Sequence, residues 1–199
     1  MTDRPYLSAG AQLLRQYPVR GSWLRWTFKA PLYLWRMGLG FLIGRYIMVI
    51  TTSGRKSGLP RYTMAEWHPL TSGGKFVPVN YGERAQWYRN IVADPHVTIQ
   101  TSDGAEHVLA RRITADAELL DAYRVMKAVN PVMTQWYLDA NGIEEGEADL
   151  LAKKDRVYIL SFDPTDEPTP PPLEADLLWL WSVIGMALVL LRRGGKRRN

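Results

Sequence analysis

Short runs of apolar, often β-branched residues occupy the centre of the chain and are separated by turn signals. One such signal is Asp103-Gly104, which lies between two alternating runs as in a β-hairpin. Runs of this length and composition predict strands. The six predicted strands cover residues 46–52, 61–68, 75–80, 97–101, 107–113 and 156–162.

Three segments between these strands have a helical pattern, at 85–93, 115–129 and 132–140. Asp94-Pro95 ends the first and Asn130-Pro131 separates the other two, because proline stops a helix and restricts the residue before it. A doubly wound parallel sheet needs a helix after almost every strand, which this pattern lacks. We therefore predict an α+β fold, a small closed or half-closed β-barrel with helices across its openings.

Residues 1–45 form a different kind of segment, in which aromatic rings are mixed with cations. Trp23, Trp26 and Trp35 are interspersed with Arg25 and Arg36. This mixture suits the head-group layer of a membrane, where ring and charge each find favourable surroundings. An amphipathic N-terminal helix packed on its own domain has the same pattern, so both interpretations stay open.

The barrel is predicted to end at residue 162, and a proline-rich stretch, residues 163–176, is expected to form an extended spacer. Residues 177–199 then begin with 15 uncharged apolar residues and include five cations near their end. A helix of that apolar length spans ~22 Å, against ~30 Å for the hydrocarbon layer. We expect a hydrophobic helix in the cytoplasmic leaflet, in preference to a full crossing or to an extra core helix on the barrel.

Charge is divided unevenly along the 199 residues. Residues 1–45 carry seven lysines and arginines against one acid, residues 192–199 carry five against none, and residues 46–191 carry thirteen against nineteen. A nucleic-acid-binding domain would place its cations on the folded body, whereas here they flank apolar segments. Anionic membrane lipids are therefore the predicted partner, and nucleic acid is not.

The chain has no cysteine, which excludes disulfides, thiolate catalysis and cysteine-ligated metal sites. His68, His96 and His107 are scattered and lack the spacing of a metal site. The sequence has no arrangement of serine, histidine and aspartate that suggests a catalytic triad, and no obvious pair of carboxylates for acid–base catalysis. If the protein is an enzyme, a bound cofactor is expected to supply its chemistry.

The densest polar cluster is TTSGRKSGLPR, residues 51–61, between the first two predicted strands. Its glycines, hydroxyls and three cations can present N–H groups and positive charge to a multiply anionic ligand. The spacing does not fit a Walker loop, so ATP hydrolysis is not implied. A solvated turn between strands has the same composition.

A second cluster, NYGERAQWYRN at residues 80–90, joins a strand end to a helix start. Its aromatic side chains can form a slot for a flat ring, with N–H groups of the first helical turn facing the ligand. Alternatively, Trp87 and Tyr88 close one end of the barrel. These residues alone favour neither interpretation.

Together the two clusters resemble a known family. VITTSGRKSGLPR, followed by a strand and then by QWYRNIVADPHVTIQ, is similar in order and spacing to the deazaflavin-dependent nitroreductases, split β-barrel proteins that use coenzyme F-420. The similarity covers about residues 47–162. It implies a split β-barrel domain over residues 46–162 and favours the ligand-binding interpretation of both clusters.

The resemblance implies roles for three groups of residues. In that family the turn contacts the anionic tail of the coenzyme, which assigns Arg55, Lys56, Ser57, Gly58 and Arg61. The strand end and helix start lie beside the deazaflavin ring, which assigns Asn80, Tyr81, Gly82, Trp87 and Tyr88. The family's acceptor pocket corresponds here to Met133, Trp136 and Tyr137. The residue that hydrogen-bonds or protonates the acceptor is expected to be Tyr81, Tyr88 or Tyr137.

These assignments predict an oxidoreductase that passes a hydride from reduced coenzyme F-420 to a lipophilic acceptor at the cytoplasmic face of the cell membrane. A quinone is the expected acceptor, with a nitro or enone compound as the other possibility. Split barrels often dimerise, so a homodimer is also expected. Two alternatives stay open: a barrel that stores or senses the coenzyme without turnover, and a barrel that binds FMN or haem.

Overall fold

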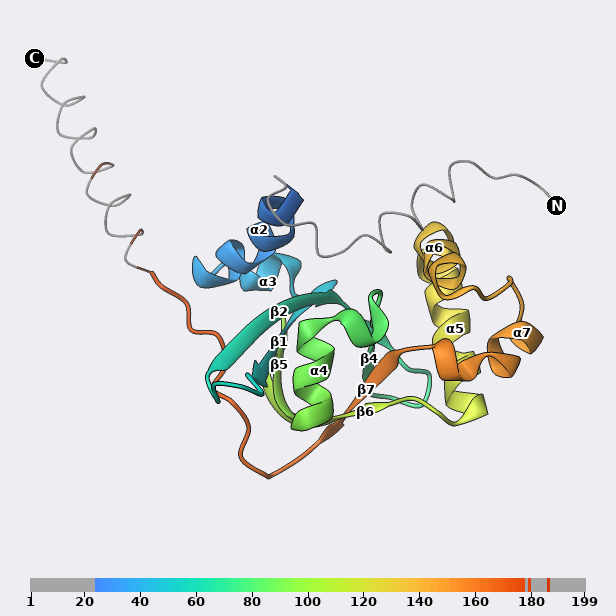
Figure 1. Cartoon of the computed structure of the whole chain (residues 1–199). Helices are drawn as coiled ribbons and strands as arrows, with labels where there is room; N and C mark the ends of the chain where they lie inside the picture. The colour runs from blue at the N-terminus through green and yellow to red at the C-terminus, as the bar shows by residue number, and fades with distance from the viewer. Residues whose placement is uncertain (1–23, 178, 180–185, 187–199) are drawn as a thin grey trace, which may run out of the picture.

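The computed structural model describes residues 24–177, 179 and 186, and its centre is one antiparallel sheet surrounded by helices (Figure 1). The strands follow the order β2-β1-β5-β6-β7-β4-β3 across the sheet. Their bounds are Ile47–Ser53 (β1), Pro60–Glu66 (β2), His68–Pro69 (β3), Lys75–Pro78 (β4), His96–Thr101 (β5), Gly104–Arg112 (β6) and Ile159–Pro164 (β7).

The two edge strands of this sheet are consecutive in the chain, with Trp67 alone between them. β2 pairs with β1 along its whole length, from Ser53↔Pro60 to Ile47↔Glu66, and β3 then pairs with β4 through His68↔Phe76. One bent stretch of chain thus joins both edges, and the sheet curls into the half-closed barrel that the sequence predicted.

The number of strands corrects the prediction of six, because the single run expected at 61–68 divides at Trp67 into β2 and β3. The register with β1 ends at Ile47↔Glu66, and the last backbone hydrogen bond on that side is from the Trp67 N–H to the Tyr46 carbonyl at 3.1 Å. The next partner of the chain is β4. The indole N–H of Trp67 donates to the Gly44 carbonyl at 3.0 Å, which holds the bend in place.

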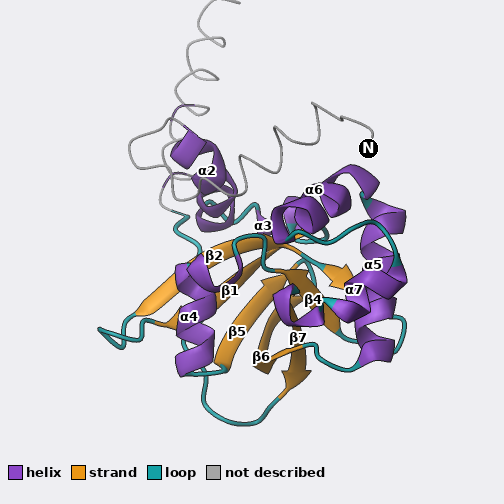
Figure 2. Cartoon of the chain, turned by 45° about the vertical axis from the view of Figure 1, so that its right-hand side comes forward, coloured by secondary structure: helices purple, strands orange, loops and turns teal. Residues whose placement is uncertain are grey.

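Helices cover the barrel openings (Figure 2). The three that the sequence predicted are confirmed to within two residues, and Asn130 begins α6 as its N-cap by accepting from the Met133 N–H at 3.2 Å. The short helices α3 and α7 were missed because four to six residues carry no readable period. The helices are Leu24–Arg36 (α2), Gly40–Ile43 (α3), Gln86–Ala93 (α4), Asp116–Val129 (α5), Pro131–Asn141 (α6) and Glu147–Ala152 (α7), with 3-10 turns at Gly82–Arg84 and Lys154–Arg156.

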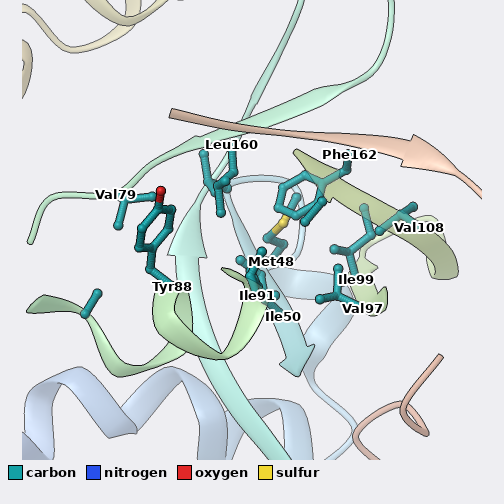
Figure 3. Close-up of a cluster of buried hydrophobic side chains, with 13 residues drawn as sticks. Met48, Ile50, Val79, Tyr88, Ile91, Val97, Ile99, Val108, Leu160 and Phe162 are labelled. Atoms are coloured by element: carbon teal, nitrogen blue, oxygen red, sulfur yellow. The ribbon is translucent and has the colours of Figure 1, made fainter. Parts of the chain in front are cut away.

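Two apolar cores lie on opposite faces of the curled sheet. In β4, Val77 belongs to the core inside the barrel and its neighbour Phe76 belongs to the core under α5 and α6. Successive strand residues point to opposite faces, so a strand covered on both sides is apolar throughout. The inner core, which α4 closes with Tyr88 and Ile91, is shown in Figure 3.

Residues 165–177, here called the strap, have no helix or strand, in keeping with their prolines. The strap is nevertheless docked on the barrel. The Gln100 side chain accepts from the Leu173 N–H at 2.7 Å and donates to the Leu173 carbonyl at 3.1 Å, and Leu173 is buried. The Thr98 hydroxyl donates to the Pro170 carbonyl at 2.5 Å. Polar side chains of β5 therefore take the place of a strand partner.

The two terminal segments are described only in part. The aromatic and basic N-terminal stretch is helical from Leu24 onward as α2, and residues 1–23 lie outside the described residues. The predicted apolar helix at 177–191 and the basic residues after it lie almost wholly outside them as well. Among the described residues, no helix combines the length and the apolarity needed to cross a bilayer.

Candidate functional site

The turn between β1 and β2 is compact because two glycines allow it. The Gly54 N–H donates to the Leu59 carbonyl at 2.9 Å, and the Gly58 N–H donates to the Gly54 carbonyl at 2.7 Å. Gly58 has φ +66°, which side-chain-bearing residues rarely adopt, and a Cβ on Gly54 would lie 2.9 Å from the Ser57 Oγ. The turn therefore projects Arg55, Lys56 and Ser57 into solvent-accessible space.

Helix α4 fixes this turn through Arg55. The guanidinium donates to Asn90 Oδ1 at 2.9 Å and to Gln86 Oε1 at 2.8 Å. Asn90 is buried and donates in turn to the Thr52 hydroxyl at 3.2 Å. Both partners of the guanidinium are neutral, so these contacts orient Arg55 without neutralising its charge.

A cavity of about 380 Å³ lies between the turn and the first turns of α4. We call it the basic cavity. In the part of the chain that the structure describes, no carboxylate forms an ion pair with its three cations. The N–H groups at the start of α4 add positive partial charge on the same side. Its lining residues are Gly54, Arg55, Lys56, Ser57, Arg61, Tyr62, Thr63, Gln86, Trp87 and Asn90.

A second, larger cavity of about 590 Å³ lies between β2, α2 and the α5–α6 corner. We call it the apolar cavity, because aliphatic, methionine and aromatic side chains make up most of its wall. Five polar side chains are placed among them. The apolar lining is Pro31, Tyr46, Ile47, Met64, Ala65, Pro78, Tyr81, Trp87, Met126, Met133 and Tyr137, and the polar lining is Glu66, His68, Asn80, Asn130 and Thr134.

Trp87 lines both cavities. It is the second residue of α4, and its neighbour Tyr88 points instead into the inner core (Figure 3). Consecutive helix residues differ in direction by about 100°, which explains why one faces the ligand side and the other the core. The indole therefore stands where a site for anions meets a site for an apolar ring.

The three predicted catalytic tyrosines are in different situations. Tyr81 lines the apolar cavity. Tyr88 is 7% exposed, packs edge to face on Tyr158 with 5.5 Å between ring centroids, and lines neither cavity. The Tyr137 hydroxyl donates to the Tyr158 carbonyl at 3.0 Å and accepts from the Tyr158 N–H at 2.8 Å.

The Tyr137 hydroxyl thus both donates to and accepts from the backbone of Tyr158, the residue before β7. Burial raises the pKa of the Tyr137 phenol well above its ordinary value. Tyr137 lines the apolar cavity, but its hydroxyl joins α6 to the chain just before β7. This geometry favours a structural role and leaves Tyr81 as the tyrosine placed to meet an acceptor.

The remaining predicted residues divide between the two cavities and the framework. Asn80 and Met133 line the apolar cavity, whereas Trp136 lines neither cavity. Gly82 is buried with φ +49°, and a Cβ there would lie 3.0 Å from the Tyr158 ring, so its role is close packing. Gly58 shapes the turn and is absent from both linings.

Several lining residues were missed by sequence reasoning. Met64, Glu66 and His68 come from the β2–β3 stretch, and Asn130 and Thr134 come from the start of α6. The three strand residues are spaced by two, the spacing that places side chains on one side of a strand. That spacing was readable in the sequence, but which side faces a cavity depends on how the sheet curls.

A family model described as F420H(2)-dependent quinone reductase matches residues 36–140 of the chain. That stretch includes every side chain that the sequence predicted for the site, from Arg55 to Tyr137. The family resemblance inferred from the sequence is thereby confirmed. Comparison with curated proteins gives no match.

Solved structures are also similar, at low sequence identity. An F420-H2 dependent reductase, FDR-A, is 22% identical, covers 60% of this chain and 95% of its own, and has a TM-score of 0.45. A domain-swapped dimer is 17% identical, covers 71% and 97%, and has a TM-score of 0.46. HutZ, described as a haem storage protein from Vibrio cholerae, is 16% identical, covers 64% and 87%, and has a TM-score of 0.41.

Proposed function

The chain belongs to the F420H(2)-dependent quinone reductase family, and from this premise we propose that it reduces a lipophilic quinone with reduced coenzyme F-420. The observation that carries the proposal is the meeting of a basic and an apolar cavity at Trp87. A redox coenzyme with an anionic tail and a flat ring needs both kinds of site side by side. Nitro and enone compounds are the secondary acceptors in this proposal.

The basic cavity fits the anionic tail of the coenzyme. Arg55, Lys56 and Arg61 carry charge that no described carboxylate neutralises, and Ser57 adds a hydroxyl beside them. Charge-assisted hydrogen bonds to such anions are stronger than neutral ones. Trp87 and the start of α4 would hold the ring, and the reduced deazaflavin supplies a hydride when it is bound.

The apolar cavity fits a quinone ring with a short polar edge. Methionine and aromatic side chains cover most of its wall, which favours a planar apolar molecule. Asn80, Tyr81 and Asn130 supply N–H and O–H donors for carbonyl oxygens, whereas the Thr134 hydroxyl donates to the Asn130 carbonyl. Tyr81 is our choice for the residue that hydrogen-bonds the acceptor oxygen on which negative charge develops.

We also propose that the enzyme works on the cytoplasmic face of the membrane, where a lipophilic quinone resides. Phe41, Leu42 and Tyr46 are 63%, 57% and 64% exposed, and Tyr46 also lines the apolar cavity. Arg45 is exposed beside them, with its guanidinium 5.5 Å from the Tyr46 ring centroid. An aromatic and basic surface beside the cavity suits anionic lipid head groups. A homodimer is a further part of the proposal.

The test is turnover by the purified full-length chain. Oxidation of the reduced coenzyme is followed by its absorbance before and after addition of menadione or a longer-chain quinone. Acceptor-dependent oxidation is expected, with little oxidation in the absence of quinone. Tight coenzyme binding without turnover would instead favour a storage or sensing module. A flavin or Soret absorption band in the purified protein would favour FMN or haem in the barrel.

A further inference from the structure

One side of the bent β2–β3 stretch supplies an ionisable pair to the apolar cavity. Met64, Glu66 and His68 follow one another at a spacing of two and all line the cavity. The His68 side chain is 7% exposed, whereas that of Glu66 is 44% exposed. The pair thus extends from the buried wall of the cavity to solvent.

The His68 imidazole packs against an aromatic ring of the core. Its ring lies 5.3 Å from the ring of the fully buried Phe76, at an interplanar angle of 40°. Its Nε2 is 3.8 Å from Glu66 Oε1, and within the described residues no other acid forms an ion pair with it. A buried imidazole with so little hydrogen bonding inside the protein has capacity left for a ligand in the cavity.

Other charged groups near this stretch are engaged elsewhere. Lys75, on β4, pairs with Glu106 at 2.8 Å, and Asp121, on α5, accepts from the Thr71 N–H at 2.8 Å. Across the cavity, the Tyr137 hydroxyl is tied to the Tyr158 backbone. Glu66 is therefore the charged group that governs His68 most directly.

Reduction of a quinone requires a proton as well as a hydride. The hydride brings two electrons to the quinone and forms one new bond to hydrogen. The negative charge that remains on an oxygen is then neutralised by a proton, which gives the hydroquinone. Among the described residues that line the cavity, His68 is the side chain whose ordinary pKa lies near neutrality.

We propose that His68 is a catalytic acid that protonates the acceptor oxygen in the apolar cavity and is reprotonated from solvent past Glu66. This inference rests on the proposed quinone reductase function. The N–H bond of the imidazolium breaks as the O–H bond of the hydroquinone forms, and the imidazole is left neutral. The reduced coenzyme supplies both electrons, so no further reductant is needed.

The electrostatics give this role a definite pH dependence. Burial lowers the pKa of His68 below its ordinary value of 6.5, and the Glu66 carboxylate opposes the shift. The imidazolium is therefore populated mainly at acidic pH. Quinone reduction should accelerate as the pH falls through the His68 pKa.

The first experiment compares pH profiles of quinone reduction in the coenzyme-loaded protein. His68→Gln, which keeps a polar group but cannot deliver a proton in this pH range, should lower the rate at pH 6 about 100-fold and remove the acidic rise. His107→Gln is the matched control, because His107 is an exposed strand residue outside both cavities. Glu66→Gln should move the acidic rise to lower pH, because it removes the charge that favours the imidazolium.

The second experiment needs no coenzyme. The chain has three histidines, so their imidazole C–H resonances can be assigned by NMR from the two glutamine variants. The His68 resonance should titrate below pH 6.5 and should move when menadione is added, whereas the His107 resonance should not respond to menadione. If His68→Gln fails to fold, the pH profile of Glu66→Gln tests the role of His68 instead, because Glu66 is an exposed side chain.

The outcomes separate the two proposals. Turnover in the wild-type protein with an unchanged pH profile in His68→Gln would overturn the role of His68 and leave the quinone reductase function standing. A His68 resonance that ignores menadione in an active protein would do the same. Absence of quinone turnover in the wild-type protein at every pH would overturn both.

Discussion

The three cations of the basic cavity are held in different ways. Arg55 is fixed by Gln86 and Asn90, and Arg61 reaches the Ser57 hydroxyl at 3.4 Å. Lys56 is exposed at the tip of the turn and forms no ion pair with any described residue. Its removal should therefore change ligand affinity with little effect on the fold.

We expect Lys56→Ala to weaken coenzyme binding by about 10- to 100-fold, the range for loss of one charge-assisted contact. Titration of the protein with oxidised and reduced coenzyme measures this change. Lys154→Ala is the control, because Lys154 pairs with Asp116 and lines neither cavity. An unchanged dissociation constant for Lys56→Ala would count against the anion-binding role of the turn.

Tyr137 offers the opposite test, since its hydroxyl belongs to the framework. Tyr137→Phe removes two hydrogen bonds to the Tyr158 backbone and leaves the Tyr158 N–H without that acceptor, whereas the Tyr158 carbonyl still accepts from the Val79 N–H at 2.8 Å. We expect the free energy of unfolding, measured by urea denaturation, to fall by about 1–3 kcal/mol. Quinone reduction by the folded variant should be unchanged, and its loss would return Tyr137 to the list of catalytic residues.

At the scale of whole segments, the strap has a contact with β5 that responds to pH. His96, at the start of β5, lies 2.8 Å from Asp94 and 2.6 Å from Glu167 of the strap. The hydrogen bond to Asp94 is the larger cause and that to Glu167 the smaller, and together they raise the pKa of His96 above its ordinary value of 6.5. A raised pKa means that the stabilisation is complete below the unfolded value and is lost as the pH rises through the folded value.

The strap should therefore be held more firmly at pH 6 than at pH 8. Hydrogen exchange of its amides, corrected for the intrinsic rate, is expected to be slower at the lower pH. The Leu173 N–H, which donates to Gln100, is the amide to follow. His96→Gln should remove most of the difference between the two pH values, and equal protection in the wild-type protein would show that this ion pair does not hold the strap.

Short sequence signals were sufficient to predict the turns and helix ends that depend only on neighbouring residues. The cationic turn, the start of α4 and the break at Asn130-Pro131 all follow from residues within a few positions of one another. The division at Trp67 could not be predicted, because it depends on where β1 begins and on β4 as the next partner. The docking of the strap depends likewise on Thr98 and Gln100, far away in the sequence.

The same distinction applies to the candidate site. Arg55, Lys56 and Trp87 line cavities, because they stand in the turn and at the helix start that the two sequence clusters mark, and their binding roles stay predictions. Tyr88 lies in the inner core and lines neither cavity, because a helix turns by about 100° per residue and adjacent side chains therefore point in different directions. His68 was overlooked because it was judged for metal spacing alone, without regard to the strand that carries it.

At the scale of the whole molecule, the apolar cavity adjoins an exposed surface suited to lipid. We expect the full-length chain to bind vesicles that contain phosphatidylglycerol, and to bind neutral vesicles less well, because Arg45 accompanies the exposed Phe41 and Leu42. The double variant Phe41→Ser and Leu42→Ser should lower the partition coefficient at least tenfold, from the lost burial of two apolar side chains. Cosedimentation measures both effects.

Val92→Ser provides the control for vesicle binding. Val92 is 69% exposed on α4 and lines neither cavity, so its replacement removes apolar surface without touching the proposed docking surface. Its partition coefficient should match that of the wild-type protein. If the Phe41 and Leu42 double variant had the same partition coefficient as the wild-type protein, lipid contact would lie elsewhere on the chain.

The bent stretch from Pro60 to Pro69 has a practical consequence for protein engineering. Its first part, with Arg61, faces the basic cavity, and its second part, from Met64 to His68, faces the apolar one. A library of substitutions confined to Met64 and Ala65 would diversify acceptor preference while the coenzyme-facing part keeps its pairing with β1. Insertions or deletions between the two parts should be avoided, because a one-residue slip would turn the side chains of the second part to the other side while the first part keeps its pairing with β1.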